Sequence, residues 1–270
     1  MAPHPALRAT FSPLCGEKEN RIYAAGGLGT AIALSEIALS EIALSENVFR
    51  GSRRCHESIL RIAMTAAFLI LIAYLLGSLS GSLLLGKLRG VDIRTQGSGN
   101  AGGTNAFRTQ GAAFAVGVVV IDISKGALAA WLGLRLADGT HAAWLPYATA
   151  FAAAIGHVWP IWHGFRGGKG AATVVGGVAV LWPAAVPVLL AVWLCTLIVT
   201  GYVGLSTILA GFAIIVFSVA THADIVRLVF AIAVALLLFF THRANLARLW
   251  AGTESRFEKV RLLHRLTRRA

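Results

Sequence analysis

"MTAAFLILIAYLLGSLSGSLLLGK", residues 64–87, decides the fold, because it is apolar over more than the thickness of a membrane. Residues 65–86 would form a helix about 33 Å long, and the hydrocarbon core of a bilayer is about 30 Å thick. Further apolar blocks follow at 112–135, 142–161, 171–182, 184–200, 205–220 and 224–241. Backbone amides need partners in lipid, so runs of this length are expected to be helical. The sequence predicts an all-α, polytopic transmembrane bundle of about seven helices.

The composition agrees with a membrane protein. Of 270 residues, 57% are hydrophobic and 13% charged, with a mean hydropathy of +0.72. Soluble domains contain about 25% charged residues. The net charge of +12 comes from basic residues in short loops and in the C-terminal tail, so no nucleic-acid partner is expected. Cys15, Cys55 and Cys195 form neither a disulfide framework nor a metal-ligand pattern, and no metal is expected.

The loop charges predict how the bundle is oriented. Seven crossings would place 87–111, 162–170, 201–204 and 242–270 on one face, and these segments hold fourteen Lys or Arg. The opposite loops, 136–141, 183 and 221–223, hold none. The positive-inside rule therefore puts the basic loops and the C-terminus in the cytoplasm.

The N-terminal 63 residues differ from the rest of the chain. "IALSEIALSEIALSE" at 32–46 repeats a five-residue unit three times. Successive copies on a helix would rotate by roughly 140°, so no continuous apolar stripe forms. We expect residues 1–63 to be a poorly structured extension, either a mis-assigned start or dispensable, with the working protein beginning near Met64. Residues 64–257 would form the membrane domain and 258–270 a basic C-terminal tail.

Two glycine-rich stretches on the basic face have the chemistry of phosphate cradles. "RTQGSGNAGGTNAFR" at 94–108 combines glycines with hydroxyl and amide donors between two arginines. "FRGGKG" at 165–170 places Arg166 and Lys169 around paired glycines just before a predicted helix, where free backbone N–H groups favour anions. The spacing is not that of a Walker A loop. A tight turn with a solvated basic edge is the alternative interpretation of the second stretch.

Several ionisable residues lie within or beside apolar segments. Asp122 and Lys125 are three residues apart and share one helix face, either as a structural ion pair or as a wall of a polar cavity. His157 is interpreted as a packed, hydrogen-bonded residue. His242 is followed by Asn245 at a predicted helix exit, where a solvated helix end is the alternative to a functional role.

Common acyl-transfer signatures are absent from the sequence. There is no GxSxG nucleophile elbow. None of the eight histidines is followed by an aspartate five positions on, so the His-Asp signature of coenzyme-A-dependent glycerolipid acyltransferases is missing.

The ordered motifs from Met64 to Phe257 resemble those of the bacterial integral-membrane acyl-phosphate:glycerol-3-phosphate acyltransferases. The matching elements are Gly77-Ser78, "GVDIR", "GSGNAGGTN" with Arg108, "DISKG", "GHVWP", "FRGGKG" and "HRAN" with Arg248, Gly252 and Glu254. The sequence departs from the family pattern at Gly103 and Ala171, where alanine and valine are usual. It also has Gly204 where serine is expected, so no hydroxyl is available at that position.

The resemblance implies a seven-helix bundle in the bacterial cytoplasmic (inner) membrane, with its site at the cytoplasmic leaflet and no cofactor. The residues expected to line the substrate site are Ser98, Arg108, Lys169, His242 and Asn245. The residues expected to shape the loops or contact phosphate are Gly97, Gly99, Asn100, Gly102, Thr104, Asn105, Gly167, Gly168 and Gly170.

The implied reaction transfers a fatty acyl group from acyl phosphate to glycerol 3-phosphate, giving 1-acyl-glycerol 3-phosphate and phosphate, early in phospholipid synthesis. The implied partners are the two substrates, the lipid bilayer and an enzyme that produces acyl phosphate. A transporter for an organophosphate or another anion is the alternative, because basic loops beside broken helices also suit passage. A structural scaffold would leave the glycine and asparagine content unexplained.

Overall fold

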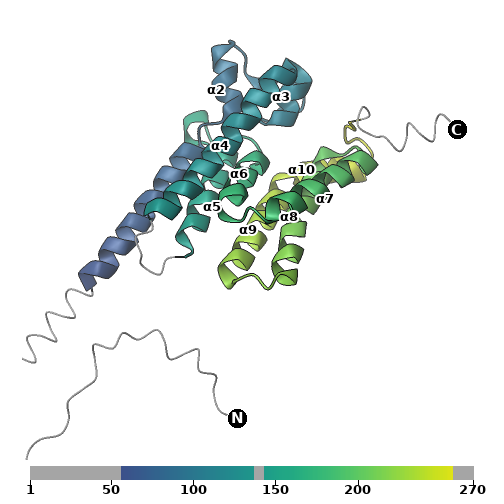
Figure 1. Cartoon of the computed structure of the whole chain (residues 1–270). Helices are drawn as coiled ribbons and strands as arrows, with labels where there is room; N and C mark the ends of the chain where they lie inside the picture. The colour runs from purple at the N-terminus through teal and green to yellow at the C-terminus, as the bar shows by residue number, and fades with distance from the viewer. Residues whose placement is uncertain (1–55, 137–142, 258–270) are drawn as a thin grey trace, which may run out of the picture. The chain divides into compact units, whose positions relative to one another are not determined.

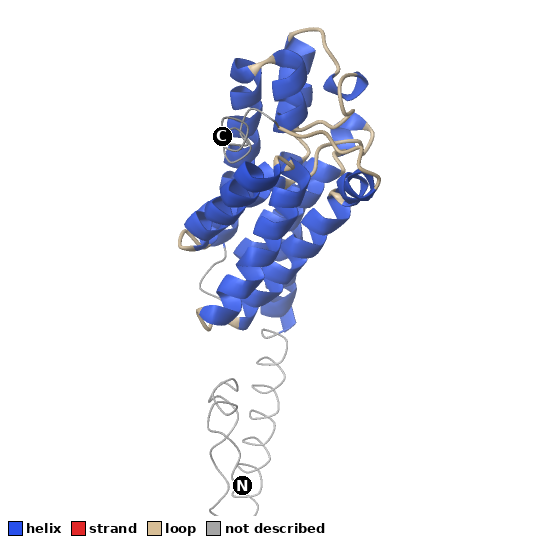
Figure 2. Ribbon diagram, turned by 90° about the vertical axis from the view of Figure 1, so that its right-hand side faces the viewer, coloured by secondary structure: helices blue, strands red, loops and turns tan. Residues whose placement is uncertain are grey.

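Helices account for all regular structure in the part of the chain that the computed structural model describes, residues 56–136 and 143–257. Figure 2 shows these helices joined by loops, with no strand among the described residues. The chain divides into two units, Met1–Leu60 and Arg61–Ala270. The IALSE repeat and the basic tail lie outside the described residues.

The first described helix differs from the predicted one at both ends. It runs from His56 to Gly77, so it includes residues 56–63, which the sequence assigned to the N-terminal extension. It then stops, and a separate helix α2 (Gly81–Leu88) follows after residues 78–80. The prediction of one continuous helix over 65–86 is therefore wrong. The run of glycine and serine at 77–82 supports the break, since the Ser78 hydroxyl bonds back to the Tyr74 carbonyl oxygen at 2.9 Å.

The later elements follow the predicted apolar blocks closely. A 3₁₀ turn η2 (Ile93–Thr95) and α3 (Gly103–Gln110) lie in the first polar stretch. The apolar blocks become α4 (Ala112–Leu136), α5 (Leu145–Val158), α6 (Ala171–Leu181), α7 (Ala185–Thr200), α8 (Val203–Ala220) and α9 (Ile225–Thr241). The predicted 142–161 helix is shorter than expected, because a second 3₁₀ turn η3 (Ile161–His163) follows α5. A short helix α10 (Arg243–Trp250) follows α9.

Length and composition identify fewer membrane spans than the sequence suggested. Three described helices are long and apolar enough to cross a bilayer: His56–Gly77, Ala112–Leu136 and Val203–Ala220. A fourth is formed if Ile225–Thr241 and Arg243–Trp250, bent by 53°, count as one broken span. Helices α6 and α7 are apolar but shorter. A multi-pass helical protein is supported, while the number of seven crossings stays a prediction.

Small residues allow the helices to approach closely. Helix α4 packs against α5 and α6, and α8 packs against α7 and α9, as Figure 1 shows. A Cβ atom on Gly126 of α4 would overlap the Thr173 backbone of α6, and one on Gly176 of α6 would overlap the Ile123 backbone of α4. Close backbone approach at small residues is the usual way that helices associate in lipid. Outward-facing side chains such as Phe68, Val120 and Val216 are more than half exposed, as expected of a lipid-facing surface.

The α4–α6 contact should tolerate no methyl group at position 126. We expect Gly126→Ala to lower the stability of the purified protein by about 1–3 kcal/mol, because its new Cβ meets backbone that cannot rotate away. Thermal unfolding in detergent measures the effect. Gly117→Ala on the same helix is the matched control, since its Cβ would meet only the tip of the Leu85 side chain at 3.0 Å. Equal melting temperatures for the two variants would contradict this packing.

Candidate active site

The first glycine loop, residues 97–102, is organised by one buried amide. Asn105 on α3 is 1% exposed. Its Oδ1 accepts a hydrogen bond from the Ser98 backbone N–H at 2.9 Å. Its Nδ2 donates to the carbonyl oxygens of Ile93 at 3.1 Å and Gln96 at 3.0 Å. Because all three bonds reach the chain around the loop, Asn105 shapes the loop rather than facing a ligand.

Two glycines in this loop adopt backbone conformations that other residues avoid. Gly97 has φ +56° and Gly99 has φ +71°. A Cβ on Gly97 would also overlap Oδ1 of Asn105. Between them, Ser98 is exposed at the surface. Asn100 and Thr104 are half-buried, and Gly102 is the N-cap of α3 without a side-chain cap.

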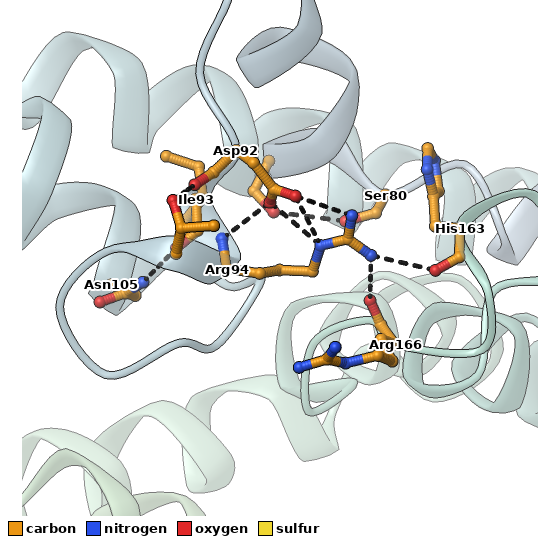
Figure 3. A network of polar contacts seen from close by, with 9 residues as sticks. Ser80, Asp92, Ile93, Arg94, Asn105, His163 and Arg166 are labelled. Carbon is orange, nitrogen blue, oxygen red and sulfur yellow. Dashed lines mark hydrogen bonds and ion pairs between the residues drawn. The ribbon is translucent and has the colours of Figure 1, made fainter.

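Arg94 ties the start of this region to the second glycine loop, residues 164–170. Its Nη1 donates to the carbonyl oxygens of His163 at 3.0 Å and Arg166 at 3.4 Å. Its Nε and Nη2 bind the Asp92 carboxylate, with the shortest contact at 2.8 Å (Figure 3). Hydrogen bonds from the Arg94 side chain and then from its backbone N–H lower the pKa of Asp92 to about 2, so this carboxylate is charged at neutral pH. The sequence predicted no such linking role for Arg94, although Arg94 ends the "GVDIR" motif.

The second loop is seated on the end of α5. The N–H of Gly167 donates to Val158 O and that of Gly168 to His157 O, each at 3.1 Å. A Cβ on Gly168 would overlap Nε2 of His157 and approach the Ala101 carbonyl oxygen at 2.7 Å. Since Ala101 belongs to the first loop, the two glycine loops meet at Gly168.

The second loop ends at the N-terminus of α6. Gly170, with φ +85°, is the N-cap and gives α6 no side-chain cap. The first N–H groups of a helix have no partner within the helix, and they attract anions. The first N–H groups of α6 are therefore the free backbone donors beside Lys169, whereas the N–H groups of Gly167 and Gly168 are already bound to the end of α5.

Lys169 joins the second loop to the C-terminal part of the chain. Its Nζ donates to Oδ1 of Asn245 on α10. The Asn245 Nδ2 in turn donates to Glu254 at 2.6 Å, and the same carboxylate binds Nε of Arg248 at 2.7 Å. Burial, followed by the positive charges of Arg248 and Arg108, lowers the pKa of Lys169 to about 8, and Glu254 opposes this shift. An ammonium with two cationic neighbours suits a bound anion.

His242 brings an imidazole to the neighbourhood of Lys169. This residue follows α9 and is 5% exposed. Its Nδ1 lies 2.8 Å from Leu238 O. A carbonyl oxygen can only accept, so Nδ1 carries the proton and Nε2 is left as an acceptor. The adjacent Thr241 hydroxyl donates to the Lys169 carbonyl oxygen at 3.1 Å, which ties the end of α9 to the second loop.

Arg108 lies exposed in the last turn of α3, and its guanidinium carbon is 5.4 Å from the centre of the Phe257 ring. The Phe257 N–H donates to Gly201 O at 2.8 Å, which fixes the ring beside the α7–α8 turn. The C-terminal segment thus reaches both Arg108 and the region of Tyr202. Phe257 was missed by the sequence analysis, because no motif marks a single aromatic residue.

Gly204, where serine was expected, lies against Asn245. A Cβ there would come within 2.8 Å of Cβ and 2.9 Å of Cγ of Asn245. In this structure Asn245 therefore occupies space that a side chain at position 204 would need.

Comparisons with known proteins agree with the motifs. The family model described as glycerol-3-phosphate acyltransferase matches residues 67–252. The chain is 39% identical over 186 residues to the glycerol-3-phosphate acyltransferase of Symbiobacterium thermophilum, covering 69% of this chain and 92% of that protein. It is 41% identical over 189 residues to the enzyme of that description from Geobacillus kaustophilus, covering 70% and 94%.

A solved structure is also similar to this chain. It is that of PlsY (YgiH), an integral membrane glycerol 3-phosphate acyltransferase, in its glycerol 3-phosphate form. The TM-score is 0.67 at 36% identity, covering 71% of this chain and 95% of that one. The lysophosphatidic acid form of the same protein gives a TM-score of 0.66.

Replacing the Asn105 amide should open the first loop. We expect Asn105→Asp to destabilise the protein by about 1–3 kcal/mol or more, because a carboxylate cannot donate to the two carbonyl oxygens that Nδ2 serves. Thermal unfolding together with limited proteolysis within 89–102 measures this. Thr95→Ala, which removes one exposed hydrogen bond to Asp92 O, is the control and should change neither readout. An Asn105→Asp protein as stable and as protease-resistant as the parent would show that the amide does not hold the loop.

Proposed function

This chain belongs to the glycerol-3-phosphate acyltransferase family, and we propose that it transfers a fatty acyl group from acyl phosphate to glycerol 3-phosphate. The products are 1-acyl-glycerol 3-phosphate (lysophosphatidic acid) and inorganic phosphate. The observation that carries the proposal is the meeting of two glycine loops at Gly168 and Ala101, with Lys169 and its cationic neighbours beside them. Both substrates carry a phosphate, and each loop suits one.

The chemistry requires little beyond placement. An acyl phosphate is a mixed anhydride with a good leaving group, so neither a covalent serine nor a strong base is needed. The glycerol hydroxyl oxygen forms a bond to the carbonyl carbon, the bond from that carbon to the phosphate oxygen breaks, and the hydroxyl proton passes to the departing phosphate. Holding the reactants in line and stabilising the developing charge supply the rate enhancement.

The proposed roles follow from where each side chain lies. Lys169 and the free N–H groups at the start of α6 hold one phosphate, the glycines around Lys169 shape the loop, and Asn245 orients the ammonium. Ser98 and Arg108, on the first loop and α3, hold the other phosphate. His242 offers Nε2 as an acceptor for a glycerol hydroxyl other than the one that reacts. The acyl chain would lie in the bilayer against the apolar helices.

We place the protein in the bacterial cytoplasmic (inner) membrane, with the loops and the C-terminus in the cytoplasm. The basic loops support this orientation through the positive-inside rule. A donor made in the cytoplasm implies a functional link to an enzyme that produces acyl phosphate. Early phospholipid synthesis is the pathway that the family membership implies.

Removing the Lys169 ammonium should impair catalysis without unfolding the protein. A charge-assisted contact to phosphate is worth about 1.5–3 kcal/mol, so Lys169→Ala should lower kcat/KM by about ten- to a hundredfold. Lys169→Arg should restore activity only in part, since a planar guanidinium does not occupy the space of an ammonium. Arg135→Ala, an exposed charge in the last turn of α4, is the control and should be nearly silent. A well-folded Lys169→Ala protein with parental activity would refute the phosphate role of this loop.

The activity should also fall at alkaline pH. The pKa of Lys169 is depressed to about 8, so the free enzyme loses this positive charge as the pH rises through 8 rather than near 10.5. We expect kcat/KM to decrease between pH 7 and 9.5. The substrate phosphates do not cause this decrease, because they have second pKa values of about 6 and are already ionised in this range. Lys169→Arg should flatten the profile, because guanidinium stays charged. An equally steep fall in Lys169→Arg would assign the titration to another group.

The choice of acyl donor provides a direct test of the proposed function. With no His-Asp signature in the sequence, purified protein should acylate glycerol 3-phosphate from acyl phosphate and leave acyl coenzyme A unused. Product formation from radiolabelled glycerol 3-phosphate with each donor, at matched acyl-chain length, measures this. Comparable turnover with both donors would remove the proposed mechanism.

A further inference from the structure

A cluster of three ionisable side chains is buried outside the substrate site. Asp122 and Lys125 lie one turn apart on α4, and His157 lies in the last turn of α5. Their exposed fractions are 2%, 4% and 3%. The proposed mechanism uses none of the three, and uncompensated charges in such surroundings are costly. Their presence therefore calls for a role.

Each of the three N–H groups of the Lys125 ammonium has a partner. Its Nζ lies 3.0 Å from Oδ1 of Asp122, 2.9 Å from Leu79 O and 2.8 Å from Nδ1 of His157. An ammonium has three N–H groups and no lone pair. The Asp122 carboxylate also accepts the Gly81 backbone N–H at 3.1 Å. The ion-pair interpretation of Asp122 and Lys125 thus holds, with His157 as a third member.

These contacts fix which nitrogen of His157 carries its proton. Because Lys125 can only donate, Nδ1 at 2.8 Å must accept, and an N–H there would place two donors against each other. Nδ1 also lies 3.3 Å from Oδ1 of Asp122, and the shorter contact, to Lys125, favours Nδ1 as an acceptor. The proton of the neutral imidazole therefore lies on Nε2.

The Nε2 atom faces the place where the glycine loops meet. A Cβ built on Gly168 would overlap this nitrogen and would also approach Ala101 O. The His157 backbone holds the same loop, since His157 O accepts the Gly168 N–H at 3.1 Å. The imidazole edge thus lies against Gly168 of the second loop, which in turn lies against Ala101 of the first loop.

We propose that Asp122 and Lys125 act as a positioning pair that holds His157 in its Nε2–H form, so that the imidazole supports the two glycine loops at their meeting point. His157 is then a positioning residue, and it acts on phosphate through the loops rather than by touching substrate. The effect on turnover rests on the proposed function, whereas the protonation of the ring does not.

The position of the proton can be measured on the unmodified full-length protein. In ¹⁵N-histidine-labelled protein in lipid nanodiscs, His157 is assigned by comparison with His157→Gln. We expect a protonated, pyrrole-type Nε2 and an unprotonated, pyridine-type Nδ1 at neutral pH. A protonated Nδ1 would overturn the proposal, whether or not the protein turns over acyl phosphate.

Two substitutions of His157 distinguish the contributions of Nδ1 and Nε2 to the reaction. The amide nitrogen of glutamine reaches about as far as Nε2, whereas asparagine reaches only the place of Nδ1. We expect His157→Asn to raise the KM for the phosphate substrates about tenfold with kcat changed less than threefold, because the shorter side chain no longer reaches the meeting point of the loops. His157→Gln should stay within about threefold of the parent in both parameters.

Equal losses in the two variants, or unchanged KM in His157→Asn, would contradict the positioning role. Melting temperatures of both variants, measured alongside, show whether each is folded. Absence of turnover by the parent protein would refute the proposed function instead, and the ¹⁵N measurement would then decide the proposal alone.

Discussion

The structure depends on one constraint: backbone groups at a helix break need partners where little water is available. The break at residues 78–80 leaves the Leu79 carbonyl and the Gly81 N–H without the partners of a continuous helix. Lys125 and Asp122 bind these two groups and each other. Removing one member of such a buried pair typically costs about 3–5 kcal/mol, because the other charge is left uncompensated. The pair therefore stabilises the break, and through His157 it reaches the glycine loops.

From this break the polar face is built by a few long-range contacts. Arg94 links the segment after α2 to His163 and to Arg166 of the second glycine loop, 69 and 72 residues away along the chain. Lys169 meets Asn245, 76 residues away, and Glu254 closes the group by binding Asn245 and Arg248. Each loop is thus held from outside itself. Glycine-rich segments lose much conformational freedom on ordering, so such external bonds help to hold the two loops in one conformation.

Local sequence patterns predicted the helices of α4 and of α6 to α9 to within a few residues, because each is a continuous apolar block between polar loops. The same patterns wrongly predicted one continuous helix over 65–86. Hydropathy stays high through the break at residues 78–80, and glycine and serine are only a weak signal for a helix end. The glycine loops and Lys169 were recognisable from composition and from family motifs. The partners of those residues were not, because a contact such as Arg94 with His163 O depends on tertiary structure. Gly204 was noted as a departure from the expected serine, and its contact with Asn245 is visible only in the structure.

The central claim is that the two glycine loops hold two phosphate-bearing substrates side by side for direct acyl transfer. Its most direct test is inorganic phosphate release by the purified protein given acyl phosphate, with and without glycerol 3-phosphate. Direct transfer predicts release that depends on glycerol 3-phosphate and matches the 1-acyl product one for one. Phosphate release at the same rate without the acceptor, or no release in its presence, would contradict the claim.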